Sequence, residues 1–177
     1  MKEILEEILK DPRSSIALFA LIISVISLIL AVYTAIQNRK NNRLGVRPLA
    51  YVLPMDYEDH IAVIIQNKGT GPLISSKISF HNGKQERDYL VDFMPALNEG
   101  FYWTTFSKTK RIVLRPGEDK ALLEFKGDIQ NQDYIKQRDI IRKELSKIEI
   151  KLNYTSVFNE RNPFKLNFKL SWYSRLK

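Results

Sequence analysis

Residues 14–36 form an uncharged and strongly apolar segment, which constrains this chain more than any other feature of its sequence. At about 1.5 Å of rise per residue, a helix of this length extends about 35 Å, more than the roughly 30 Å hydrocarbon core of a bilayer. The rest of the 177 residues read as ordinary soluble sequence. The sequence therefore predicts one transmembrane helix with one small domain, and it excludes a multi-span transporter.

Composition divides the chain into four parts. Residues 1–13 are a short amphipathic segment, which either lies on the bilayer or frays as a free terminus. Residues 14–36 are the transmembrane helix, and no small-residue cleavage site follows them, so we expect the helix to stay uncleaved. Residues 37–47 are a basic juxtamembrane linker, and residues 48–177 are a soluble β domain.

The basic residues around the apolar segment predict its orientation. Three Lys or Arg residues precede the segment, and four follow it closely: Arg39, Lys40, Arg43 and Arg47. The positive-inside rule then favours a cytoplasmic C-terminal domain, in the inner membrane of a bacterium. We expect Arg39, Lys40 and Arg43 to contact anionic lipid headgroups.

Small and hydroxyl-bearing side chains recur inside the apolar segment at alternating spacings of three and four residues, and we call them the small-residue stripe. They are Ala17, Ala20, Ser24, Ser27, Ala31 and Thr34. Such spacing keeps one face of a helix against a partner, and small residues allow helices to approach closely in lipid. We therefore predict a homo-oligomer. A dimer or trimer buries the stripe in a dry contact, whereas a larger ring turns the hydroxyls towards a narrow pore.

The remainder of the chain is predicted to be mainly β. Apolar and polar residues alternate over 148–154 and 166–172, as in half-buried strands, and one helix is predicted at 132–146. We expect about seven or eight of nine candidate segments to form strands, and this number predicts a β-sandwich or partly open barrel with one inserted helix. The other candidate strands are residues 49–53, 61–66, 73–80, 89–94, 101–106, 111–114 and 120–125.

Catalytic and metal-binding signatures are absent from the sequence. There is no cysteine, and the two histidines, His60 and His81, have no partner at ligand spacing. Asp56, Glu58 and Asp59 lie beside His60, in what we interpret as a solvated loop; the alternative is a metal or acid/base site. We therefore expect no enzyme activity, no catalytic residues, no metal and no cofactor.

A basic and aromatic segment is the best candidate for ligand binding. Residues 100–116 contain no acidic residue, and cations follow closely after aromatic side chains. Aromatic faces stack on bases and cations hold phosphates, so a nucleotide is the expected ligand, and no duplex nucleic acid is expected. The alternative is that these aromatic residues pack in a strand core and the lysines protect its edges. The candidate ligand-binding residues are Trp103, Lys108, Lys110, Arg111 and Arg115.

Two stretches of sequence carry a resemblance to known proteins. Arg43-Leu44-Gly45-Val46-Arg47-Pro48 and Asn67-Lys68-Gly69-Thr70-Gly71-Pro72 resemble a class of short bacterial inner-membrane proteins with one helix and a β domain. The architecture also resembles transmembrane effectors of anti-phage nucleotide-signalling systems (CBASS-like or Hailong-like). This resemblance implies that the β domain senses a nucleotide second messenger and that the helices form a pore. The alternatives are a membrane-anchored protein-interaction module without channel activity, and a lipid-surface sensor.

Overall fold

The apolar segment lies in one long helix. The structure is a computed structural model that describes residues 12–108 and 110–175, and the chain divides into two compact units, Met1–Leu44 and Gly45–Lys177. Helix α2 (Pro12–Gly45) has no buried residue, and it is long and apolar enough to cross a membrane. The amphipathic segment predicted at 1–13 falls outside the described residues, apart from its last two.

The predicted linker at 37–47 is mostly helical. Helix α2 continues without interruption to Gly45, beyond the apolar segment. Residues 37–44 contain neither glycine nor proline, so nothing in them stops helical propagation until Gly45 and Pro48. The second compact unit therefore begins at Gly45, three residues before the predicted domain boundary.

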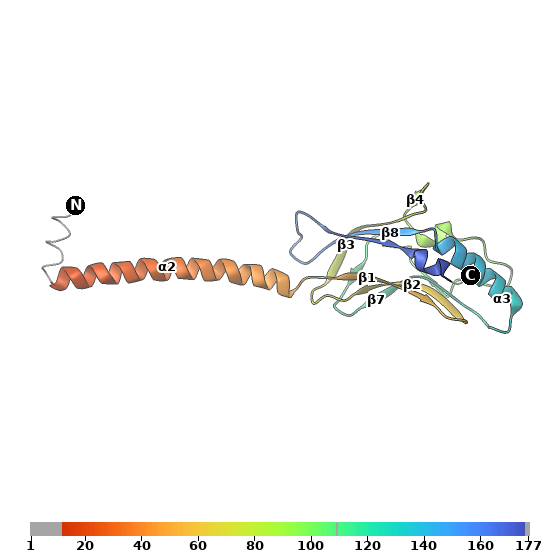
Figure 1. Cartoon of the computed structure of the whole chain (residues 1–177), viewed down its shortest axis with the longest axis horizontal. Coiled ribbons are helices and arrows are strands. Elements are labelled where there is room, and N and C mark those ends of the chain that lie inside the picture. Colours follow the sequence, from red (N-terminus) through yellow and green to blue (C-terminus); the bar gives the residue numbers. More distant parts are fainter. Residues whose placement is uncertain (1–11, 109, 176–177) are drawn as a thin grey trace. The chain divides into compact units, whose positions relative to one another are not determined.

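The second unit is a two-sheet β domain, and the predicted sandwich architecture is confirmed (Figure 1). One sheet, sheet A, has the strand order β1-β2-β7-β5, and the other, sheet B, has the order β4-β3-β8-β9 with β6 also paired to β3. All pairings are antiparallel. Sheet A contains β1 (Ala50–Asp56), β2 (His60–Asn67), β5 (Thr105–Phe106) and β7 (Asp119–Lys126). Sheet B contains β3 (Leu73–His81), β4 (Glu86–Arg87), β6 (Val113–Leu114), β8 (Glu149–Thr155) and β9 (Phe164–Lys169).

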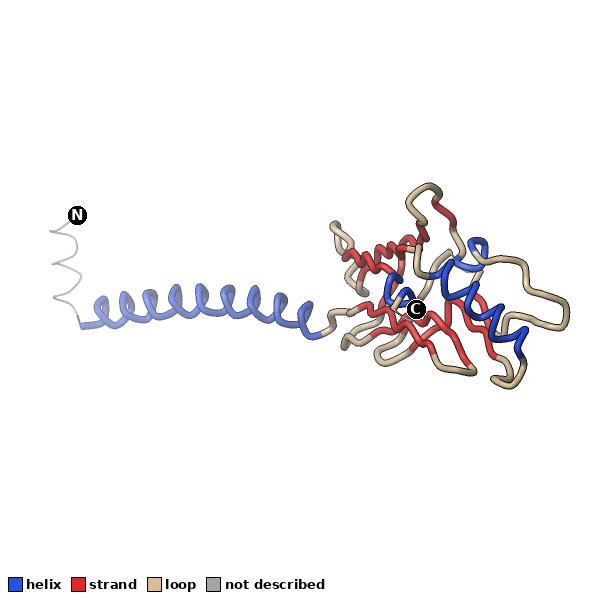
Figure 2. The backbone as a smooth tube through the Cα atoms, turned by 45° about the vertical axis from the view of Figure 1, so that its right-hand side comes forward, coloured by secondary structure: helices blue, strands red, loops and turns tan. Residues whose placement is uncertain are grey.

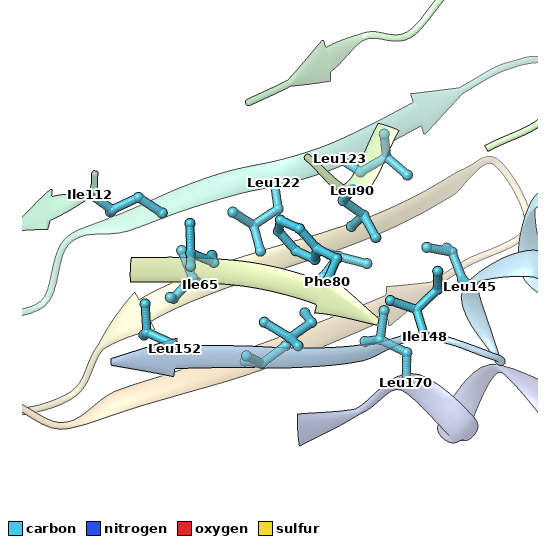
Figure 3. Close-up of a cluster of buried hydrophobic side chains, with 14 of the residues drawn as sticks. Ile65, Phe80, Leu90, Ile112, Leu122, Leu123, Leu145, Ile148, Leu152 and Leu170 are labelled. Atoms are coloured by element: carbon cyan, nitrogen blue, oxygen red, sulfur yellow. The ribbon is translucent and has the colours of Figure 1, made fainter. Parts of the chain in front are cut away.

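Apolar side chains from both sheets fill the space between them. Figure 3 shows Ile65 of β2 and Leu122 of β7 in the same cluster as Phe80 of β3 and Leu152 of β8, and all four are at most 2% exposed. Burying each such side chain stabilises the fold by roughly 1.5–3 kcal/mol. The apolar residues of the alternating pattern that predicted the strands are thus the residues buried between the two sheets.

The predicted helix at 132–146 is α3 (Gln132–Leu145), which begins after Asn131. The Asn131 side chain accepts hydrogen bonds from the backbone N–H groups of Asp133 and Tyr134, and so caps the first turn. Figure 2 shows α3 beside the short 3-10 helix η2 (Leu170–Ser174), which follows β9.

Four of the predicted strands differ from the structure. Residues 89–94 contain the 3-10 helix η1 (Leu90–Phe93), which ends where the Met94 N–H donates to the Val91 carbonyl. The strands predicted at 101–106 and 111–114 are each reduced to two residues, those of β5 and β6. The last strand ends at Lys169, and η2 then turns Tyr173 into the core, where its hydroxyl donates a 2.5 Å hydrogen bond to the Ala62 carbonyl.

A turn at residues 67–72 holds the chain where it leaves α2, and we call this arrangement the clamp. The Thr70 hydroxyl donates to the Gly45 carbonyl at 2.6 Å, and the Thr70 N–H donates to the Arg47 carbonyl at 3.2 Å. The buried Asn67 side chain accepts from the Leu49 N–H at 3.2 Å. Residues 45–49 are thus bound to the turn before β1 begins.

Gly69 and Gly71 are required because the two segments approach so closely. A Cβ atom on Gly71 would lie 1.8 Å from the Val46 carbonyl oxygen, and one on Gly69 would lie 2.4 Å from the Arg47 carbonyl oxygen. Both neighbours are backbone atoms, which cannot rotate out of the way. The glycines of this turn therefore serve the contact with residues 45–49.

We predict that Gly71→Ala lowers the free energy of unfolding of the domain by at least about 2 kcal/mol, because the new methyl group forces the clamp apart. The matched control is Gly45→Ala, where a Cβ meets nothing within 4 Å, and it should change stability by less than about 0.5 kcal/mol. Urea unfolding of the full chain in detergent, followed by tryptophan fluorescence, measures both. Equal midpoints for the two variants would refute the clamp.

Candidate functional site

The predicted binding segment, residues 100–116, runs from sheet A to sheet B. Its aromatic residues Phe101 and Trp103 are half-buried and meet the Phe125 ring edge-on, with centroids 6.0 Å and 5.6 Å from it. Tyr102 and Phe106 are exposed. Trp103 therefore packs against the core instead of offering a free face to a ligand.

The five predicted ligand-binding residues do not form one cluster. Trp103 contacts Phe125 near the end of β7, whereas Arg115 pairs with Glu118 just before β7 begins, and a strand of that length separates them by about 20 Å. Lys110 pairs with Asp88 at 2.9 Å, and this hydrogen bond raises the lysine pKa. Lys108 lies over the Phe106 ring, and Arg111 is exposed.

The predicted oligomerisation and headgroup-contact residues all lie in α2. The six members of the small-residue stripe occupy its apolar part, and Arg39, Lys40 and Arg43 occupy its last two turns. None of these nine residues is buried. At 100° per residue, spacings of three and four keep the stripe on one face of the helix.

A cavity of about 750 Å³ lies between the β1–β2 hairpin, α3 and η2, and the sequence analysis did not predict it. Its volume is within the range of small-molecule sites. The lining residues are Asp56, Tyr57, Glu58, Arg138, Asp139, Arg142, Lys143, Ser146, Tyr173 and Ser174. Three cations and three carboxylates therefore face one space.

Helix α3 positions the two arginines of this cavity. Tyr134, Gln137, Ile141 and Leu145 turn inward and are buried, which fixes the rotation of the helix. Arg138 and Arg142 are four residues apart, so they lie one above the other on a neighbouring face. Burial raises the pKa of Tyr134 and of Tyr173, so both phenols stay neutral.

Arg142 forms a buried, two-pronged ion pair with Asp56. Its Nε and Nη2 atoms each donate to one carboxylate oxygen at 2.8 Å, and the Asp56 side chain is only 2% exposed. The hydrogen bond to Asp56 raises the Arg142 pKa. Arg142 also donates to Asp139 at 2.6 Å. Asp56 is thus a buried link between β1 and α3, and the interpretation of this carboxylate as part of a solvated loop is wrong.

Arg138 retains one unsatisfied donor. Its Nη1 atom donates to the Glu58 carbonyl, and its Nη2 atom lies 3.6 Å from Asp139. Its Nε atom is buried, and no acceptor for it exists among the described residues. A buried donor without a partner costs about 1–3 kcal/mol, so an acceptor brought by a ligand gains a hydrogen bond there. Arg138 is therefore the residue of this cavity with a donor left for a ligand.

Further groups could contact a ligand bound at Arg138. The Lys143 side chain and the Glu58 side chain are exposed at the cavity, and the Tyr57 residue is 60% exposed. The Tyr57 ring stacks at 6.2 Å from the His60 ring, which orients one aromatic face. Among residues 12–108 and 110–175, no group of three His, Cys, Asp or Glu side chains is arranged to hold a metal ion.

The chain matches a protein family described as "Domain of unknown function (DUF8453)" over residues 14–174. It belongs to this family. The match begins inside α2 and ends in η2, so the family includes the apolar helix and the sandwich together. A comparison with curated proteins found no match.

We predict that Asp56→Ala lowers the free energy of unfolding by up to about 3–5 kcal/mol, because it removes the buried carboxylate and leaves the largely buried Arg142 paired only with Asp139, whose side chain is exposed. Glu86→Ala is the control: it breaks the exposed pair with Lys77 and should cost about 0.2–1 kcal/mol. Urea unfolding of the full chain in detergent measures both. A loss for Asp56→Ala as small as that of the control would contradict the structural role of the ion pair.

Proposed function

We propose that this chain is a homo-oligomeric, single-pass membrane effector. Helix α2 spans the bacterial inner membrane, and the cytoplasmic sandwich binds an anionic ligand and thereby gates a pore between the helices. The observation that carries the proposal is the apolar helix α2, which has the small-residue stripe on one face and no buried residue.

The exposure of α2 supports a membrane span. Large apolar side chains cover the helix, and Ile16, Leu28 and Ile29 are each more than 60% exposed. Burying such side chains in a bilayer recovers about 25 cal/mol for each Å² of apolar surface that water would otherwise contact. None of the described helix residues is buried, and we infer that lipid and other copies of α2 cover them.

The small-residue stripe supports self-association within the membrane. Lipid removes the hydrophobic drive between helices, so close packing across small residues and hydroxyl hydrogen bonds supply much of the association energy. In a ring, Ser24, Ser27 and Thr34 would line a narrow water path, and the bulky apolar residues would face lipid.

The clamp supports coupling between the sandwich and the span. The helix ends at Gly45, whose carbonyl already accepts from Thr70, and β1 begins at Ala50. A tether that only holds a module near the bilayer needs a flexible linker, and Gly- or Ser-rich segments serve that purpose. The hydrogen bonds of the clamp instead hold Gly45, Arg47 and Leu49 to the sandwich, and we infer that a displacement of the domain reaches the end of the helix through them.

The cavity at Arg138 supports an anionic ligand with an aromatic part. A phosphate group could accept from the Arg138 Nε–H and pair with Lys143, and it would replace the Asp139 contact to Arg138. The exposed Tyr57 face could stack on a base. This combination favours a nucleotide as the ligand. We therefore propose the cavity as the binding site, in place of residues 100–116.

The pore is tested by ion flux from liposomes that contain the full chain. A panel of cyclic dinucleotides, cyclic trinucleotides and linear oligoadenylates is added, with inorganic phosphate as the control ligand. We predict that one nucleotide class triggers flux and that Ser24→Leu and Ser27→Leu each reduce it at least about tenfold, since leucine blocks a narrow path. The matched control, Ile23→Leu, lies off the stripe and should leave the flux unchanged.

The outcome also separates the effector from an interaction module. Absence of flux with every ligand, or flux that neither serine variant changes, would contradict the pore. Calorimetry with the same panel then distinguishes a nucleotide-binding domain from a protein-interaction module. Nucleotide binding that Arg138→Gln abolishes supports the nucleotide site. Absence of any nucleotide binding favours the membrane-anchored module that binds another protein.

A further inference from the structure

The chain passes into the sandwich at one end of the two sheets, which we call the junction end. Ala50 pairs with Asn67 there, and on the other sheet Ile74 pairs with Thr155. The Gly117 N–H donates to the Asn67 carbonyl, which brings the turn before β7 to the same end. Four segments meet at the junction end: residues 46–49, 67–72, 115–118 and 156–163 (Figure 1).

The junction end is basic. Its four segments contain two carboxylates, and both are engaged: Glu118 pairs with Arg115, and Glu160 accepts hydrogen bonds from the Ser156 N–H and hydroxyl. The four cations are all exposed, and they are Arg47, Lys68, Arg115 and Arg161.

The opposite end of sheet A has the opposite charge. Residues 57–59, 98–104 and 127–131 connect or flank the strands there, and they contain no lysine or arginine. Their charged residues are Glu58, Asp59, Glu99 and Asp128. Sheet A therefore has a positive end where the chain arrives from α2 and a negative end opposite to it.

The β8–β9 loop places apolar side chains on the junction end. Ser156 accepts from the Phe158 N–H at 3.1 Å through its hydroxyl, and the Asn159 N–H donates to the Ser156 carbonyl at 3.2 Å. Asn159 takes the left-handed conformation, with φ of 47°, which closes this turn. Val157 at its tip is 57% exposed, and Phe158 is 42% exposed. An ordered loop that exposes apolar residues among cations has the composition of a membrane-interface contact.

We propose that the junction end docks on the anionic headgroups of the membrane that α2 spans, with Val157 at the level of the lipid interface. This inference depends on the membrane span of the proposed function. Residues 37–45 extend about 14 Å as a helix, and the headgroup layer accounts for about 5–8 Å of that length. Less than about 10 Å then separates Gly45 from the headgroups. Attraction of Arg47, Lys68, Arg115 and Arg161 to anionic lipid closes this distance.

The chain contains no cysteine, so a single introduced cysteine can be labelled specifically. Three variants of the full chain carry an environment-sensitive fluorophore: Val157→Cys, Tyr102→Cys and Ile29→Cys. Tyr102 is the matched control, because it is 77% exposed and lies at the opposite end of sheet A. Each variant is reconstituted in vesicles of phosphatidylcholine with or without phosphatidylglycerol, together with a lipid that bears a nitroxide near its headgroup.

We expect the label at position 157 to be quenched several-fold more than the label at position 102, and only in vesicles that contain phosphatidylglycerol. High salt should abolish the difference. Equal quenching at 157 and 102 in both vesicles, with position 29 shielded from aqueous iodide, would overturn docking and leave the span intact. Iodide access to position 29 equal to that of position 102 would overturn the span itself.

Charge reversal supplies a second test of the same surface. The double variant Lys68→Glu with Arg161→Glu should reduce quenching at position 157 to the level of position 102. The control variant Lys84→Glu changes an exposed lysine of the β3–β4 turn, outside the junction end, and should leave quenching unchanged. An equal effect of both changes would show attraction by overall charge and would overturn docking through this end.

Discussion

The buried side chain of Asn67 is the interaction on which the arrangement of this domain depends. Its oxygen accepts from the Leu49 and Gly69 N–H groups, and its nitrogen donates to the Gly71 and Leu114 carbonyls. These four bonds join the chain arriving from α2, the glycine turn, and β6 of the opposite sheet. A buried amide that satisfies all four of its hydrogen bonds specifies one geometry, because any other leaves polar groups unpaired.

The fold was predictable where a repeating pattern decides it. Period-2 alternation located β8, and apolar periodicity located α3, because burial of one face is a local property of the sequence. The apolar pattern predicted the wrong structure where a tertiary contact determines the backbone conformation. Leu170 and Trp172 continue the alternation, yet the chain turns into η2, which buries the Tyr173 ring and satisfies its hydroxyl against β2. Residues 89–94 likewise have an apolar strand-like pattern, but only Leu90 is fully buried there.

The candidate site was not predictable from local sequence. Arg142 and Asp56 are 86 residues apart, and nothing near Asp56 distinguishes it from the exposed Glu58. The one local signal was the i, i+4 spacing of Arg138 and Arg142 on the only helix of the domain predicted from the sequence. Conversely, the basic and aromatic composition of residues 100–116 was visible, but strand pairing separates Trp103 from Arg115 along β7. Composition shows which types of side chain a chain contains, and strand pairing decides which of those side chains lie close together.

The account as a whole requires that copies of α2 contact one another along the small-residue stripe, and cysteine scanning of α2 measures this directly. Single cysteines are introduced from residue 16 to residue 34 in the cysteine-free chain, and disulfide dimers are quantified after oxidation in native membranes. The account predicts maxima at residues 17, 20, 24, 27, 31 and 34, with low yields between them. Uniform yields along the helix, or maxima on another face, would contradict it.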